Sequence, residues 1–176
     1  MTRIALIYGS LSGLVVITAM IAGLTYGDTV GFLASEWVGY LIMLIAFSMV
    51  FMGIKRYRDG EKGGVIGFGR AFLVGLAIAL VAGIAYVITW EIYLAFSGNQ
   101  FIDGYIAGLI EAERAAGVTG AALDAKIAEF NALAEGYANP LFRVPMTFLE
   151  IFPVGLVVSL VSAAILRKSD VLPARG

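Results

Sequence analysis

Four long apolar stretches constrain what this chain can fold into. They cover residues 4–26, 37–54, 70–96 and 142–166. The first two contain no charged residue, the third is interrupted by Glu91, and the fourth by Arg143 and Glu150. A bilayer core of about 30 Å is crossed by roughly 20 mostly apolar residues in an α-helix. The sequence therefore predicts an all-α protein whose four transmembrane helices form a single membrane domain over residues 1–176.

The composition excludes several kinds of chemistry. Apolar residues make up 60% of the chain and charged residues 14%, whereas soluble domains are usually about 45–50% apolar and about 25% charged. The chain has no cysteine and no histidine, which rules out disulfides, zinc sites built on these residues, iron–sulfur clusters and histidine-based triads. Because the net charge is −1, no overall positive field attracts nucleic acid. We expect neither a cofactor nor a nucleic-acid partner.

Lysine and arginine are distributed unevenly between the two sides of the predicted membrane domain. Nine flank the stretches on the side of the termini, namely Arg3, Lys55, Arg56, Arg58, Lys62, Arg70, Arg167, Lys168 and Arg175. Three lie on the other side, namely Arg114, Lys126 and Arg143. Since basic residues accumulate in cytoplasmic flanks, both termini are expected in the cytoplasm and residues 98–140 outside it.

Residues 98–140 carry two helical patterns of their own. The first apolar face comprises Phe101, Ile102, Tyr105, Ile106, Leu109 and Ile110, and the second Leu123, Ile127, Phe130, Leu133 and Tyr137. Thr119 is a candidate N-cap for the second helix, and Asn139-Pro140 ends it. Two such helices bury too little surface to fold alone. We expect an outward amphipathic hairpin whose apolar faces lie on the bilayer, on the spans, on each other or on a protein partner.

A short motif follows the second apolar stretch. Residues 53–59 read Gly-Ile-Lys-Arg-Tyr-Arg-Asp, and Gly64, Ile66, Phe68, Ala71, Phe72 and Gly75 follow at fixed spacing. This pattern resembles the DUF4199 family of bacterial membrane proteins, and the similarity extends over Trp90-Glu91-Ile92-Tyr93 to the final Arg167-Lys168. The resemblance implies a multi-pass protein of the bacterial cytoplasmic (inner) membrane. It implies no activity, because the family is functionally uncharacterised.

The basic cluster at the end of the second stretch is the first candidate site. It consists of Lys55, Arg56, Tyr57, Arg58 and Asp59. A cluster of bases at the membrane interface can hold a phosphate or an anionic headgroup. The other interpretation is structural: the cluster enforces topology and caps two helices, with Arg58 and Asp59 pairing locally. Neighbouring glycines fit no phosphate-binding loop motif.

The charged residues within the spans are the second candidate site. Glu91 and Glu150 could lie at similar depth, and ionisable residues within a span are functional candidates by default. Arg143 precedes Glu150 by seven residues, about 10 Å along a helix, so Glu91 rather than Glu150 is placed to reach it. Pro153 should bend the helix beside Glu150. Glu91, Arg143 and Glu150 are either a polar ligand or ion site, or structural pairs.

Small residues recur at intervals of four in three of the spans. The rows are Gly9 and Gly13, then Ala71, Gly75, Ala79 and Gly83, then Gly155, Ser159 and Ala163. Such rows allow helices to approach closely. Most of them should serve packing within the chain, and any surplus would support a homo-oligomer.

These observations favour a non-enzymatic membrane scaffold or accessory subunit that binds partners through the hairpin and contacts lipid headgroups through the basic cluster. The alternative is a small transporter or a ligand- or ion-binding protein that uses Glu91 and Glu150 near Pro153. No catalytic motif known to us fits the residues present, so we expect no enzyme activity.

Overall fold

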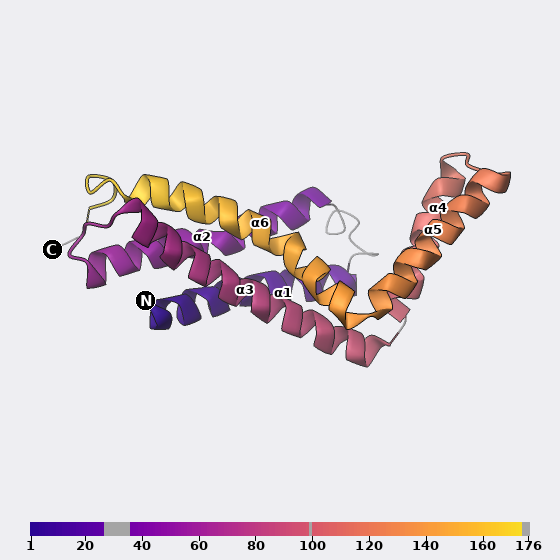
Figure 1. The fold of residues 1–176 in the computed structure, drawn as a ribbon, viewed down its shortest axis with the longest axis horizontal. Helices are drawn as coiled ribbons and strands as arrows, with labels where there is room; N and C mark the ends of the chain where they lie inside the picture. The colour runs from indigo at the N-terminus through magenta and orange to yellow at the C-terminus, as the bar shows by residue number, and fades with distance from the viewer. Residues whose placement is uncertain (27–35, 99, 174–176) are drawn as a thin grey trace. The chain divides into compact units, whose positions relative to one another are not determined.

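The structure is a computed structural model that describes residues 1–26, 36–98 and 100–173. In these residues the chain forms helices and no strand (Figure 1). The helices are α1 (Thr2–Tyr26), α2 (Glu36–Glu61), α3 (Phe68–Ser97), α4 (Gln100–Ala115), α5 (Gly120–Ala138) and α6 (Pro140–Leu166). The predicted all-α fold is confirmed.

Four of these helices are long and apolar enough to cross a membrane. Their apolar spans are Thr2–Gly23, Trp37–Glu61, Phe68–Ser97 and Pro140–Leu166. The second span runs seven residues past the predicted end at Ile54. The uncharged apolar stretch stops before Lys55, but the helix continues to Glu61. Its last turns contain an ion pair between Lys55 and Asp59. The prediction of four membrane-spanning helices is confirmed.

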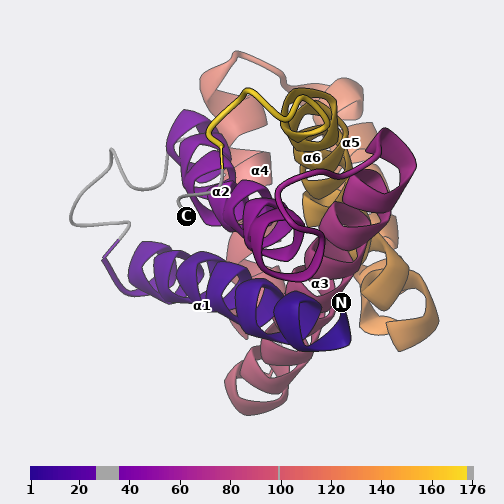
Figure 2. The same cartoon turned by 90° about the vertical axis from the view of Figure 1, so that its left-hand side faces the viewer.

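The described chain divides into two compact units. The first comprises Met1–Val87 and Phe148–Gly176, and the second comprises Ile88–Thr147. The first unit is a bundle of α1, α2, the larger part of α3 and the larger part of α6 (Figure 2). Its core contains fully buried residues from three helices, including Phe47, Val74 and Ile151. The start of α1, the connection from α2 to α3 and the end of α6 lie at one end of this unit (Figure 1).

Glycines stand where the helices of the bundle cross. A Cβ atom on Gly9 of α1 would lie 2.6 Å from the Cβ of Val81 in α3. One on Gly155 of α6 would lie 2.8 Å from the Cβ of Ala79 in α3 and 2.9 Å from the ring of Phe47 in α2. These rows of small residues therefore serve packing of α1, α2 and α6 around α3. This use of small residues is typical of helices that associate in lipid.

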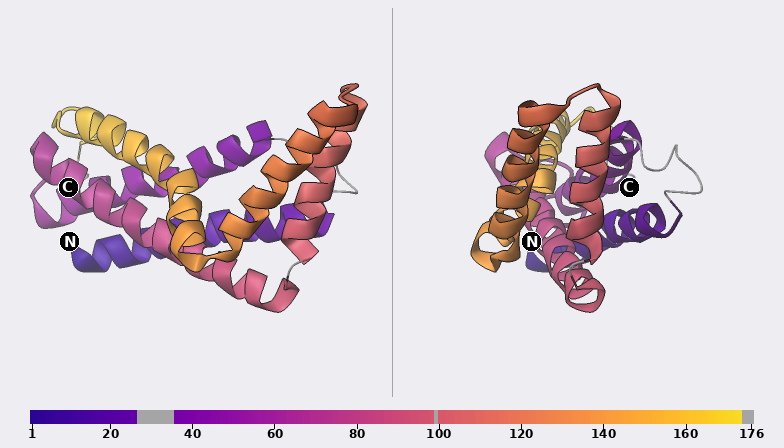
Figure 3. Two further views of the ribbon diagram at one scale, coloured as in Figure 1. Left: turned by 45° about the vertical axis from the view of Figure 1, so that its right-hand side comes forward. Right: turned by 90° about the vertical axis from the view of Figure 1, so that its right-hand side faces the viewer.

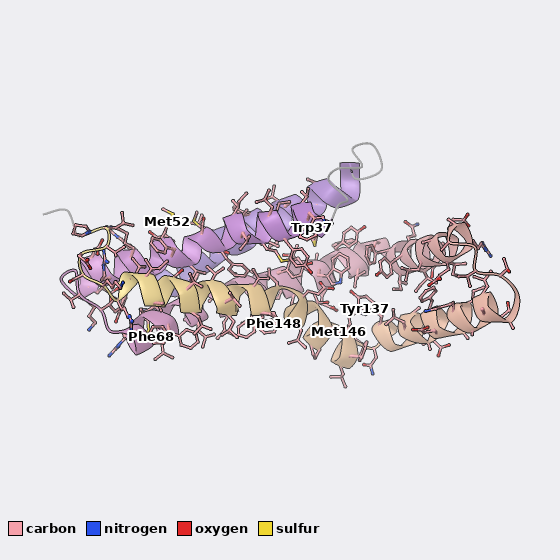
Figure 4. All side chains as sticks on the ribbon, turned by 90° about the horizontal axis from the view of Figure 1, so that it is seen from above. Trp37, Met52, Phe68, Tyr137, Met146 and Phe148 are labelled. Carbon is pink, nitrogen blue, oxygen red and sulfur yellow. The ribbon has the colours of Figure 1, made fainter. Side chains whose placement is uncertain are left out.

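Large apolar side chains are exposed along all four long helices. Leu14, Leu44, Ile84 and Val157 are each more than half exposed. Trp37, Met52 and Phe68 are also exposed (Figure 4). Apolar surface on this scale is unusual on a protein surrounded by water. It fits helices whose outer faces contact lipid.

In the second unit, α4 and α5 lie side by side (Figure 3). Gly117 and Gly120 take positive φ values of 85° and 60° in the turn between them, a conformation that glycine adopts without strain. The predicted end at Asn139-Pro140 is confirmed, because α5 ends at Ala138 and Asn139 Oδ1 accepts a hydrogen bond from the Leu141 amide at 3.0 Å.

The apolar faces of this hairpin are only partly covered by other described residues. Ile106 is buried, but Tyr105 is 52% exposed and Leu133 is 40% exposed. No residue of α5 is buried, and Thr119 precedes α5 without a side-chain capping bond. A helix that packs against a single neighbour covers only a narrow stripe of its surface. The amphipathic character of the hairpin as a whole therefore remains a prediction.

Substitution of Gly155 tests the close packing of the bundle. Gly155→Val places new atoms against Ala79 and Phe47, and overpacking a core costs about 1–3 kcal/mol. We expect a lower unfolding free energy, measured by chemical unfolding in detergent. Gly39→Val is the matched control, because a Cβ at Gly39 meets nothing within 4 Å. Equal losses for the two variants would contradict the packing.

Candidate functional site

A two-pronged ion pair joins the end of α3 to the start of α6 in the second unit. The guanidinium of Arg143 donates from Nε to Glu91 Oε1 at 2.7 Å and from Nη2 to Glu91 Oε2 at 2.6 Å. The side chains are 14% and 28% exposed. Arginine presents its donors in a planar fork that matches a carboxylate. The structure thus brings Glu91 and Arg143 together, as their shared position at the outer ends of two spans suggested.

Arg143 also holds the end of α5. Its Nη1 donates to the carbonyl oxygens of Tyr137 at 3.0 Å and Ala138 at 3.4 Å. These carbonyls belong to the last turn of α5, where a positive charge is favourable. The guanidinium carbon also lies 5.7 Å from the centre of the Tyr137 ring, within reach of a cation–π interaction. One side chain therefore links α3, α5 and α6.

Aromatic side chains surround this link. Trp90 Nε1 donates a hydrogen bond to Tyr137 Oη at 2.6 Å (Tyr137 is labelled in Figure 4). The Trp90 ring lies edge to face with the Phe101 ring, with 4.7 Å between the ring centroids. It stacks on the Tyr93 ring, with 5.4 Å between the centroids. Phe101 lies in the first turn of α4, so the cluster connects α4 to the end of α3. The sequence pattern did not predict this cluster, although Trp90 and Tyr93 are closely spaced at the end of α3.

A cavity of about 280 Å³ opens beside the ion pair. Glu91, Arg143 and Tyr137 form its polar side, and Leu94, Ile102 and Ala134 form part of its apolar side. A space of this size with one charged and one apolar side suits a small amphipathic molecule. Among the residues that the structure describes, no group of three or more acidic residues could hold a metal ion.

Glu150 lies in the first unit and is exposed on α6. Its carboxylate has no hydrogen bond or ion pair with any residue in the described ranges. α6 is one continuous helix through Pro153. A polar site that includes Glu150 together with Glu91 and Arg143 stays a prediction, as does the bend at Pro153.

The basic cluster at the end of α2 is divided between buried and exposed residues. Arg58 is fully buried, Tyr57 is 4% exposed, and Arg56 is exposed. Lys55 Nζ contacts Asp59 Oδ2 at 2.5 Å, and Arg58 Nε donates to Asp59 Oδ1 at 2.7 Å. The local pairing of Arg58 with Asp59 is therefore present. A headgroup or phosphate contact stays a prediction, and Arg56 is the member of the cluster most open to it.

Arg58 fixes the chain that follows α6. Its Nη1 donates to the carbonyl oxygens of Leu166 at 3.5 Å and Val171 at 2.9 Å, and its Nη2 donates to that of Leu172 at 2.5 Å. Leu172 has a φ of 49°, which is uncommon for a residue with a branched side chain. A buried guanidinium needs such acceptors. Arg58 thus acts as a structural connection between α2 and the segment after α6.

Four long apolar helices with many exposed apolar side chains, and an ion pair between the ends of two of them, indicate a multi-pass helical membrane protein. A family model with the description "Protein of unknown function (DUF4199)" matches residues 5–168. The chain therefore belongs to the DUF4199 family. No curated protein and no solved structure matches it.

The link made by Arg143 is tested by Arg143→Lys, which keeps the charge and removes the fork. Hydrogen bonds to a charged group contribute about 1.5–3 kcal/mol each, and lysine cannot bind Glu91 and the carbonyl of Tyr137 with the same geometry. We expect faster hydrogen exchange in the last turns of α5 and a lower unfolding free energy. Arg114→Lys is the control, since Arg114 forms only an exposed pair within α4. Unchanged exchange in α5 would show that Arg143 does not hold it.

The role of Arg58 is tested by Arg58→Lys beside Arg56→Lys. The first leaves the carbonyls of Val171 and Leu172 without their donors, whereas the second changes an exposed side chain. We expect residues 167–173 to be cut faster by protease in the first variant only. Equal rates of cleavage in both variants would rule out this connection.

Proposed function

We propose that this protein is a non-enzymatic membrane scaffold or accessory subunit, and that its α4–α5 hairpin is the surface that binds a protein partner. The observation that carries this proposal is the link formed by Arg143, which joins α3, α5 and α6 at the base of the hairpin. Such a link limits the motion of a hairpin at its base. A presented surface loses less entropy on binding when it is ordered beforehand.

The surface of the hairpin is suited to a partner of opposite charge. Residues 98–140 contain six acidic and two basic residues, so the segment carries a charge of −4. Tyr105 and Leu133 add exposed apolar groups, and tyrosine in particular is enriched at binding interfaces. The partner we infer is a membrane protein whose extramembrane part has a basic surface with apolar depressions.

The proposed location follows from the basic residues. The start of α1, the end of α2 and the end of α6 lie at one end of the first unit (Figure 1). Eight of the twelve lysine and arginine residues belong to these segments or to the start of α3, and Arg175 lies outside the described residues. The positive-inside rule places such an end in the cytoplasm. We propose a bacterial cytoplasmic membrane, with cytoplasmic termini and an outward hairpin. A homo-oligomer remains part of the proposal, although Gly9 and Gly155 already serve packing within the chain.

A second candidate function is the binding or transport of a small molecule. The cavity beside Glu91 and Arg143 favours it, because an ion pair that borders a cavity can exchange its partner for a charged ligand. Ala134→Phe separates the two functions. It fills the apolar side of the cavity and leaves the outer surface of the hairpin unchanged, so it should abolish ligand binding and spare a partner contact.

The scaffold function is tested by photocrosslinking in intact cells. A photoreactive amino acid at Tyr105 should give a protein adduct of defined mass, and the double change Glu129→Lys and Glu135→Lys should reduce its yield about tenfold. The same probe at Leu44, which is exposed on α2, is the control for contacts in the bilayer. An adduct at Tyr105 that is insensitive to the charge reversal, or no adduct, would contradict the proposed hairpin surface.

A further inference from the structure

Glu150 is placed deep within an apolar span. It lies ten residues after the start of α6 at Pro140 and sixteen residues before its end at Leu166. At a rise of about 1.5 Å per residue these positions are about 15 Å and 24 Å away along a regular helix. The span exceeds the roughly 30 Å of hydrocarbon in a bilayer, so the headgroup region reaches only its outer turns. Glutamate is shorter than the lysine and arginine side chains that extend to the membrane surface.

The face of α6 that carries Glu150 is apolar and points away from the bundle core. Leu149, Val157 and Val161 on this face are 59%, 57% and 53% exposed. Ile151 and Ser159 on the opposite face are fully buried. Glu150 is therefore a single carboxylate in a stripe of lipid-facing side chains. Charged residues in such a setting are rare, and they normally face a protein partner or water.

Pro153 adds a second hydrogen-bond acceptor beside this carboxylate. Proline has no backbone N–H, so the carbonyl of Leu149 loses the donor that a helix would supply from residue 153. Leu149 and Glu150 are adjacent, and both are exposed. Hydrocarbon offers no hydrogen-bond donor to either group. The Glu150 carboxylate and the Leu149 carbonyl therefore lack a positively charged group with several N–H donors.

Within the described ranges, no basic side chain of the chain itself provides that group. Arg143 gives its guanidinium to Glu91 and to the two carbonyls at the end of α5. In the sequence, the other basic residues lie in the end turns of the spans, beyond the spans, or in the α4–α5 hairpin. A second copy in the same orientation would bring a second Glu150 to the same depth, where two carboxylates repel.

We propose that the Glu150 face of α6 binds a transmembrane helix of another membrane protein, and that this helix carries a lysine or arginine at the depth of Glu150. The charge of the partner side chain neutralises the carboxylate, and its N–H groups also satisfy the carbonyl of Leu149. The leucine and valine side chains along α6 pack against the partner helix. This contact lies within the bilayer and does not require the hairpin to bind anything.

The test uses a synthetic helix as the partner. A leucine-rich peptide of the length of α6, with one lysine at the depth of Glu150, is incorporated into lipid vesicles with the full-length protein. The chain has no cysteine, so Lys168→Cys introduces a single site for a fluorescent label outside the span. Energy transfer to the labelled peptide reports association. We expect association about tenfold stronger than that of the all-leucine peptide, and loss of this difference in Glu150→Gln and Glu150→Leu.

The controls separate this proposal from its alternatives. Glu135→Gln, on the exposed surface of the hairpin, should leave association with the lysine peptide unchanged. Circular dichroism and thermal unfolding check that the Glu150 variants fold. Equal association with both peptides, or a lysine effect that survives Glu150→Gln, would overturn the proposal. Self-association that depends on Glu150 would instead identify a second copy as the occupant and would equally overturn it. The double variant Glu129→Lys and Glu135→Lys should still bind the lysine peptide. The experiment therefore distinguishes a wrong proposal for the hairpin surface from a wrong proposal for the Glu150 face of α6.

Discussion

The absence of hydrogen-bonding partners in hydrocarbon is the constraint on which this structure depends. Each polar group in or near a span must find its partner within the protein. Glu91 and Arg143 satisfy one another, and the remaining donors of Arg143 reach carbonyls of α5. Ser159 Oγ returns its hydrogen bond to the Gly155 carbonyl one turn earlier in α6. Glu150 and the buried hydroxyl of Ser12 have no such partner among the described residues, and for the exposed Glu150 this points to a contact outside the chain.

The hydrocarbon of the bilayer also explains how the helices associate. Lipid tails are as apolar as the side chains they surround, so burial alone does not drive helices together, and close contact must contribute instead. Gly9 and Gly155 permit that contact by bringing helix surfaces within a distance that any Cβ would prevent. The large apolar side chains are then free to face outward, as Leu14 and Val157 do. The bundle thus has apolar side chains both in its core and on its outer surface.

The sequence predicted the features that depend on hydropathy and on local pattern. The four spans followed from apolar length, and the stop at Asn139-Pro140 followed from backbone chemistry. The pairing of Glu91 with Arg143 could be anticipated because both lie near the same ends of two spans. The acceptors of Arg58 could not be anticipated, because they are backbone carbonyls more than a hundred residues away. Every residue has a backbone carbonyl, so the sequence does not show which of them accept. The sequence left open what covers Tyr105 and Leu133, because helical periodicity does not reveal how wide a face the neighbouring helix covers.

The burial of Arg58 has a consequence for how the protein is made. Its guanidinium belongs to the second helix, but its acceptors at Leu166, Val171 and Leu172 are synthesised more than a hundred residues later. During translation this arginine must stay hydrated until the ribosome has added the residues that supply these acceptors. This end of the bundle therefore closes only after α6 and the residues that follow it have been synthesised, and nascent chains that stop before them would leave the Arg58 guanidinium without these acceptors.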